Sequence, residues 1–216
     1  MLDNWLSKSK IKEVFERFVK KFFYGKLSAN RFTLLGLIFG LLSAFFIFIN
    51  GPFTSLFYPI VSLIFMILSF FLDAIDGAVA RTEVEKPSKF GGILDIFCDR
   101  TVEVFILISI ISTDPMNLIW PGIFSLAAII LCITIFLLVA GAIADLELEG
   151  SQKAIYYRKG LMERSETFLF LVLMVILVPW RFYLLWLFSG LVFLTALLRL
   201  KDAYKIFNPE KPKNAV

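Results

Sequence analysis

Long apolar stretches separated by short polar or turn-forming segments dominate the pattern of this chain. Each stretch is close to the ~20 apolar residues that a helix needs to cross the hydrocarbon core of a bilayer. There are six of them, at residues 32–49, 56–72, 91–112, 118–144, 161–178 and 182–198. The pattern therefore predicts an all-α integral membrane protein with six transmembrane helices.

The segment before the first span has apolar residues at helical spacing and basic residues on the opposite face, over residues 10–23. This pattern is typical of an amphipathic helix that lies in the membrane interface, although a helix that binds a partner protein would look similar. We therefore expect a cytosolic N-terminal segment at 1–31, a six-helix membrane domain at 32–200 and a cytosolic tail at 201–216.

The composition supports a membrane protein and excludes several kinds of site. Of the 216 residues, 59% are hydrophobic, whereas a soluble domain has about 45–50% apolar residues. The two cysteines, Cys98 and Cys132, fall inside apolar stretches, so neither a disulfide nor a CxxC metal site is expected. The chain has no histidine, which excludes imidazole ligands, Ser-His-Asp triads and histidine bases.

Basic residues are distributed asymmetrically among the loops. Apart from Arg100 and Arg181, every Lys and Arg lies before the first span, around the loop at 82–90, at 145–164 or from Arg199 onward. Basic loops face the cytoplasm in membrane proteins. We therefore expect a multi-pass protein of the cell membrane with both termini in the cytoplasm, in contact with membrane lipids and not with nucleic acid.

Four aspartates mark the ends of the second and third spans: Asp73, Asp76, Asp95 and Asp99. A charged side chain costs about 2.5–3.5 kcal/mol near the bilayer centre, so a cation should offset the group. Residues three or four apart share a helix face, and the loop at 82–90 can bring the two helices together. Oxygen ligands suit Mg²⁺ or Mn²⁺. The spacing therefore predicts a divalent metal site just below one membrane surface.

The same residues resemble a family signature. The chain reads Asp73-x-x-Asp76-Gly77-x-x-Ala80-Arg81 and, after a loop, Gly91-x-x-x-Asp95-x-x-x-Asp99. This pattern is similar, at all of its fixed positions, to the signature of the CDP-alcohol phosphatidyltransferases. The resemblance implies an enzyme of phospholipid biosynthesis that transfers a phosphatidyl-type group from a CDP-linked lipid to an alcohol and releases CMP. It also implies a homodimer.

The resemblance implies roles for individual residues. It implies two Mg²⁺ or Mn²⁺ ions bound by Asp73, Asp76, Asp95 and Asp99, and Asp99 as the general base. It implies a donor-binding set of Asp73, Gly77, Ala80, Arg81 and Asn30. By residue type alone, the small residues would equally suit close helix packing, Arg81 a cytoplasmic anchor, and Asn30 a helix cap.

Two further segments resemble the phosphatidylinositol-phosphate and archaetidylinositol-phosphate synthase-like subgroup. One is Arg100 with Glu103, an i, i+3 pair, and the other is the basic stretch before the fifth span. We expect acceptor-binding roles for Arg158, Lys159, Arg164 and Arg100, since guanidinium groups pair with phosphate. A solvated basic loop is the alternative. The acidic segment at 145–152 departs from the subgroup, so inositol phosphate, glycerol phosphate and serine all stay open, with a polyol phosphate as one candidate.

Two other functions fit parts of the pattern. A UbiA-like membrane prenyltransferase also uses Asp-rich motifs and Mg²⁺, but its two motifs lie far apart in longer chains. A divalent-cation transporter would need intramembrane carboxylates, but its site should lie near the membrane midplane, often between repeated halves. The donor is expected to be CDP-diacylglycerol or CDP-archaeol.

Overall fold

The structure, a computed structural model, describes residues 17, 19–21, 28–51, 55–82, 89–148 and 161–208, with the backbone alone for 81–82, 89 and 144–148. From Ala29 onward its elements are α3 (Ala29–Ile49), α4 (Phe57–Thr82), α5 (Lys89–Thr113), α6 (Pro115–Leu148), α7 (Arg164–Ile176), the short 3₁₀ helix η1 (Val178–Trp180) and α8 (Arg181–Phe207). No strand occurs among the described residues, so the all-α prediction is confirmed for them. The predicted amphipathic helix at 10–23 lies mostly outside them.

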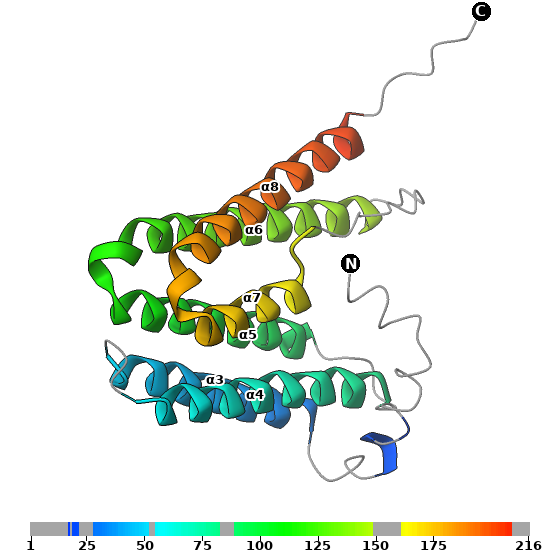
Figure 1. The fold of residues 1–216 in the computed structure, drawn as a ribbon. Coiled ribbons are helices and arrows are strands. Elements are labelled where there is room, and N and C mark those ends of the chain that lie inside the picture. Colours follow the sequence, from blue (N-terminus) through cyan, green and yellow to red (C-terminus); the bar gives the residue numbers. More distant parts are fainter. Residues whose placement is uncertain are drawn as a thin grey trace, which may run out of the picture.

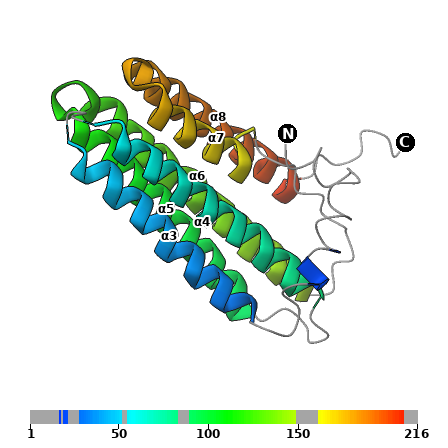
Figure 2. The same ribbon diagram turned by 60° about the horizontal axis from the view of Figure 1, so that its bottom comes forward.

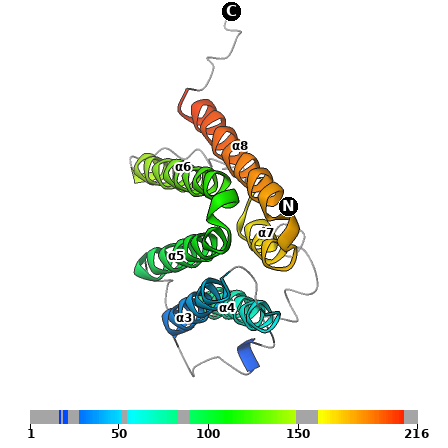
Figure 3. The same cartoon turned by 60° about the vertical axis from the view of Figure 1, so that its left-hand side comes forward.

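The long helices form three antiparallel hairpins, α3–α4, α5–α6 and α7–α8 (Figure 1). The turns between α5 and α6 and between α7 and α8 lie at one end of the bundle, together with the end of α3 and the start of α4, and α3 begins and α8 ends at the other end. Viewed along the bundle, α5 and α7 lie between the α3–α4 pair and the α6–α8 pair (Figure 3). Figure 2 shows α7 beside α8 along one side of the bundle. We call the end at which the hairpins turn the hairpin end, and the end at which α3 begins and α8 ends the open end.

Small polar residues hold α3 against α4. The Ser69 hydroxyl donates to the Gly36 carbonyl over 2.7 Å, and the Ser43 and Ser62 hydroxyls lie 2.9 Å apart. Small residues let membrane helices approach closely, and hydrogen bonds between them add roughly 1 kcal/mol. α3 packs closely on both α4 and α5, whereas α4 and α5 scarcely contact each other within the part of the chain that the structure describes.

Four helices, α3, α4, α6 and α8, are long and apolar enough to cross a membrane, which indicates a membrane-embedded protein. The fifth long helix, α5, carries Asp99, Arg100 and Glu103 in its middle, and α7 has only 13 residues. The expected spans at 91–112 and 161–178 are therefore not among the helices that are long and apolar enough to cross a membrane, because α5 carries these charges and α7 is short. The count of six spans stays a prediction.

Several helices extend beyond the apolar stretches that predicted them. α6 starts at Pro115 rather than at residue 118, since proline suits the first position of a helix. α8 continues to Phe207, past the expected domain limit at residue 200. Arg199 contributes there: its guanidinium donates to the Cys132 carbonyl of α6 over 3.2 Å and lies 5.0 Å from the centre of the Phe136 ring.

The isolated basic residue of the hairpin end, Arg181, is part of the core. Its side chain is 97% buried, although the sequence places it beside a turn. It donates to the Met174 carbonyl over 2.6 Å and to the Thr113 hydroxyl over 2.9 Å. A cation at the C-terminus of a helix satisfies carbonyls that have no partner within the helix. Arg181 therefore fastens the end of α7 to α5 and α8.

The close approach of α3 and α5 generates a stability prediction. A Cβ atom at Gly40 would lie 2.3 Å and 2.6 Å from the methyl groups of Val102 and 3.0 Å from its Cβ, so side-chain rotation cannot relieve the clash. Gly40→Ala should destabilise the protein by about 1–3 kcal/mol, measured as a lower melting temperature in detergent. Gly190→Ala is the matched control, because nothing lies within 4 Å of its Cβ position. Equal melting temperatures for the two variants would contradict the close approach.

Candidate active site

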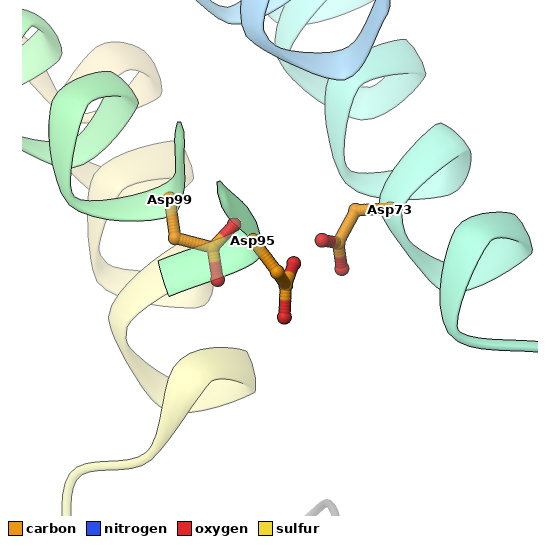
Figure 4. A group of neighbouring side chains, drawn as sticks. All are labelled: Asp73, Asp95 and Asp99. Carbon is orange, nitrogen blue, oxygen red and sulfur yellow. The ribbon is translucent and has the colours of Figure 1, made fainter. Parts of the chain in front are cut away.

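Three carboxylates meet at the open end of the bundle, from helices that are otherwise apart. Asp73 extends from α4, and Asp95 and Asp99 extend from consecutive turns of α5; a ligand oxygen of each lies within 4.8 Å of the others (Figure 4). The i, i+4 spacing puts the two α5 residues on one face, and α3 holds α4 and α5 at the distance that leaves room between them. The predicted convergence of these three aspartates is confirmed.

The fourth aspartate of the motif is placed differently. Asp76 is only 6% exposed and does not belong to the group of three. Its neighbours on α4, Ile75 and Val79, pack with Phe32 of α3 in a small apolar cluster, and this packing sets how α4 is rotated. Because Asp76 follows Asp73 by less than one turn, it lies at the edge of the same face. Its role as a metal ligand stays a prediction.

A cation from another hairpin lies among the three carboxylates. The Arg164 Nη2 atom pairs with both Asp73 and Asp99, and its Nη1 atom lies 3.8 Å from an Asp95 oxygen. The sequence predicted Arg164 as an acceptor-binding residue and did not predict its contact with the acids. The guanidinium thus joins α4, α5 and α7 at one point.

The start of α7 fixes where the Arg164 backbone lies. Glu163 and Glu166 form a capping box, in which the side chain of each residue accepts a hydrogen bond from the backbone N–H of the other. The Glu163 amide donates to Glu166 Oε2 over 3.3 Å. Arg164 follows the N-cap directly, so its position against the carboxylates is set by this turn.

The charges explain why a cation is needed. Two carboxylates about 5 Å apart repel by roughly 3 kcal/mol at an effective dielectric constant of ~20, and the Asp73 and Asp99 side chains are only 15% and 20% exposed. Oxygens bound to opposite sides of one Mg²⁺ or Mn²⁺ lie a little over 4 Å apart, at roughly 2.1 Å from the ion. A spread within 4.8 Å reaches that value through small side-chain rotations, so the residues present fit such an ion.

A cavity of about 340 Å³ lies beside the carboxylates, between α5, α6, α7 and α8. Its charged lining is mostly basic and consists of Arg100, Arg164, Arg199, Asp99 and Glu163. The volume is at the lower end of the range typical of small-molecule sites, about 300–1,000 Å³. We call it the arginine cavity. Three guanidinium groups around a small space suit a phosphate-bearing molecule.

Arg199 is a residue that the sequence interpretation missed. The sequence assigned it no role in the site, but in the structure its side chain turns toward α6 and lines the arginine cavity. Its place at the C-terminal end of the last apolar stretch was the available signal. The contact with α6 depends on how α6 and α8 pack, which local sequence does not show.

Arg100 reaches the same cavity from α5. It donates to Glu103 Oε2 over 2.5 Å, so the expected i, i+3 pair is confirmed. Glu103 is 93% buried and lies on the wall of a second, smaller cavity of about 60 Å³ that Asp73 and Asp99 also line. Asp99 therefore borders both spaces.

Aromatic packing between α4 and α7 forms one wall of the smaller cavity. The rings of Phe70 and Phe168 stack with their centroids 4.2 Å apart, one turn of helix from Asp73 and Arg164 respectively. Both rings line this cavity, together with Gly36 and Ser69. These rings give the cavity an apolar wall beside Asp73 and Asp99.

The remaining predicted residues are only partly accounted for. Gly77 and Ala80 are half-buried on α4 beyond Asp76, and the side chain of Arg81 is not described. Asn30 is the second residue of α3 and Ser28 occupies the N-cap position, so the helix-cap interpretation of Asn30 is wrong. Arg158 and Lys159 lie outside the described residues. The donor- and acceptor-binding roles of these residues stay predictions.

Comparison with known proteins points to one family. Residues 26–197 match the sequence model of the CDP-alcohol phosphatidyltransferases, a range that includes all three carboxylates, Arg164 and the capping box. An archaetidylinositol phosphate synthase of Pyrococcus horikoshii is 33% identical over 101 residues, which cover 47% of this chain and 50% of that protein. The chain thus spans about half the length of this relative. The inner membrane protein YnjF of Escherichia coli is 28% identical over 207 residues, 94% of this chain and 96% of that protein.

A solved structure shares the fold. The crystal structure of Mycobacterium tuberculosis phosphatidylinositol phosphate synthase, PgsA1, with CDP-DAG bound, superposes with a TM-score of 0.55. It is 19% identical and the match covers 96% of this chain and 100% of that chain. At this identity the likeness concerns the helix arrangement, which extends over nearly the whole length of both proteins.

The site geometry generates a metal-binding prediction. Mn²⁺ should raise the melting temperature of the purified protein in detergent, since a ligand at 100 times its Kd adds roughly 2.7 kcal/mol. Asp95→Asn should lose most of that shift, because it removes a charged ligand while keeping the side chain's shape. Asp114→Asn is the matched control, because Asp114 lies at the hairpin end. A full Mn²⁺ shift in Asp95→Asn would exclude Asp95 from the metal site.

Proposed function

Since the chain belongs to the CDP-alcohol phosphatidyltransferase family, we propose that it transfers a phosphatidyl-type group from a CDP-linked lipid to an alcohol acceptor and releases CMP. The observation that carries the proposal is the group of three carboxylates, from two helices, beside a cavity lined by arginines. The family match also favours this reaction over a UbiA-like prenyltransferase or a cation transporter.

The metal-binding residues are Asp73, Asp95 and Asp99, with Asp76 as a further ligand that would allow a second ion. All the donors are carboxylate oxygens, which suit Mg²⁺ or Mn²⁺. Such ions, when bound, neutralise the donor's diphosphate and stabilise the negative charge on the departing CMP oxygen. Asp73 and Asp95 hold the site from opposite helices, so the donor's phosphates lie between α4 and α5.

Asp99 is the general base. It borders both the small cavity between α4 and α7 and the arginine cavity, so a single carboxylate can reach an acceptor that enters from the latter side. The acceptor hydroxyl gives its proton to Asp99, its oxygen forms a bond to the lipid-linked phosphorus, and the bond from that phosphorus to CMP breaks. A positioned base of this kind contributes about 10²–10⁴-fold in rate.

The acceptor is a small anionic alcohol, and a polyol phosphate suits the site best. Arg100, Arg164 and Arg199 line a space of about 340 Å³, and the sequence predicts Arg158 and Lys159 as further acceptor-binding residues. Guanidinium groups bind phosphate oxygens with directed, charge-assisted hydrogen bonds. The name of the archaeal relative, a synthase of an inositol phosphate lipid, agrees with an acceptor of this class.

The donor is CDP-diacylglycerol or CDP-archaeol. CDP-DAG is bound in the M. tuberculosis structure with the same fold. In this chain Gly77 and Ala80 leave room for the nucleotide beside α4, and Arg81 and Asn30 contact its polar groups. The CDP group is placed at the open end, where the charged residues of the bundle are concentrated.

The membrane setting follows from the two different ends of the bundle. We propose six spans with the open end and both termini in the cytoplasm, an interfacial helix at 10–23, and a homodimer. The distribution of Lys and Arg supports this orientation. The exposed aromatic residues of the hairpin end, Trp120, Trp180 and Tyr183, suit the opposite membrane interface.

The proposal is tested by CMP release. The purified protein in lipid nanodiscs is given CDP-diacylglycerol or CDP-archaeol, Mg²⁺ or Mn²⁺, and inositol phosphate, glycerol phosphate or serine in turn. Asp99→Asn should lower the rate at least 100-fold, because it removes the base and a metal ligand, while Asp114→Asn should behave like the wild type. Release of CMP at the wild-type rate by Asp99→Asn would exclude its catalytic role.

The arginine cavity generates a prediction about the acceptor. Arg199→Gln should raise the KM for a phosphorylated acceptor about tenfold or more, since a hydrogen bond to a charged group contributes roughly 1.5–3 kcal/mol, and should leave the KM for the CDP-lipid within about twofold. Lys205→Gln, an equal charge change on the exposed side of α8, is the control. Unchanged acceptor KM in Arg199→Gln would mean that the acceptor binds elsewhere.

A further inference from the structure

We infer that Arg164 is an internal cation that occupies the carboxylate group when no metal is bound, and that it moves into the arginine cavity when metal enters. The metal site and the acceptor site are thereby coupled through one side chain. This inference rests on the proposed function, because it takes the three carboxylates as the metal site. It adds a regulatory role that neither the motif nor the cavity alone assigns.

The first step is that Arg164 and a metal ion require the same oxygens. Its guanidinium pairs with the Oδ1 atoms of Asp73 and Asp99 and lies near Oδ1 of Asp95. These are the three residues whose oxygens come within 4.8 Å of one another. An ion at their centre would lie within a few ångströms of the guanidinium, and two cations that close repel strongly. Metal and guanidinium therefore exclude each other.

The second step is that a cavity next to Arg164 can accommodate its displaced side chain. It lines the arginine cavity as well as the small cavity, and 33% of its side chain is exposed. The capping box of Glu163 and Glu166 fixes the backbone at the start of α7, so the movement needs rotation of the side chain alone. The displaced guanidinium then lies on the same side as Arg100 and Arg199.

The third step is the consequence for the acceptor. Arg164 already lines the arginine cavity but pairs with the motif carboxylates; once displaced, its guanidinium lies within the cavity, and a phosphate group there offsets its charge. Metal binding therefore strengthens binding of a phosphorylated ligand, and by linkage the ligand strengthens metal binding by the same factor. An acceptor bound before the metal would meet a cavity in which one of the three guanidinium groups is engaged by the carboxylates.

The test uses the full chain in detergent and measures Mn²⁺ binding directly, by electron paramagnetic resonance of the free ion, without donor or acceptor. Arg164→Gln removes the competing cation and should bind Mn²⁺ at least tenfold more tightly than the wild type. Arg199→Gln removes an equal charge from the same cavity and should change the affinity less than threefold. Arg164→Lys keeps a competing cation and should stay within about threefold of the wild type.

The direction of the change separates this inference from a merely structural role. If Arg164 only holds the carboxylates in place for the metal, Arg164→Gln will bind Mn²⁺ more weakly than the wild type, and the inference is overturned. Equal affinity in both proteins overturns it as well. If neither protein binds Mn²⁺, the metal site of the proposed function fails together with the inference, so the two failures are distinguishable.

A second measurement addresses the coupling. Glycerol 3-phosphate is the probe, and its Kd is measured by calorimetry with and without Mn²⁺. In the wild type Mn²⁺ should tighten its binding at least fivefold, and in Arg164→Gln the factor should fall below twofold. The same factor in both proteins would show that the coupling does not pass through Arg164. In EDTA the melting temperature of Arg164→Gln should also be lower than that of Arg199→Gln, because its carboxylates have lost their cation.

Discussion

Repulsion among carboxylates at the open end is the constraint on which the rest of this structure depends. Three acids from α4 and α5 lie within 4.8 Å of one another in surroundings that are partly shielded from water, where like charges repel more strongly than in bulk solvent. A cation among them offsets this repulsion. Arg164 supplies that cation from α7, 65 residues along the chain from Asp99, and it ties the third hairpin to the first two where direct helix packing is slight.

The space that these acids occupy exists because α3 holds its two neighbours apart. Gly36 and Gly40 lie on α3 where α4 and α5 approach most closely, and the Ser69 hydroxyl is bonded to the α3 backbone. With both helices packed on α3 rather than on each other, carboxylates can extend between them without filling a core position. The same packing thus stabilises the bundle and leaves a site open to a ligand.

Arginine side chains have different roles at the two ends of the bundle. At the hairpin end Arg181 is buried and satisfies carbonyls of α7 together with the Thr113 hydroxyl, so its charge serves the fold. At the open end Arg100, Arg164 and Arg199 surround a cavity, and Arg100 and Arg164 form ion pairs with acids of the same site. Substitution at the first end should act on stability, and at the second on binding and rate.

Much of this could be predicted from the sequence alone, because it depends on local spacing. Hydrophobic stretches determined the all-α membrane class, and i, i+4 spacing determined that Asp95 and Asp99 share a face. Only the tertiary structure decided that Asp76 lies outside the group of three, that Arg164 lies among the carboxylates, and that Arg199 turns into the cavity. Helical periodicity says which face of a helix a side chain occupies, whereas the distance between faces of different helices depends on how those helices pack.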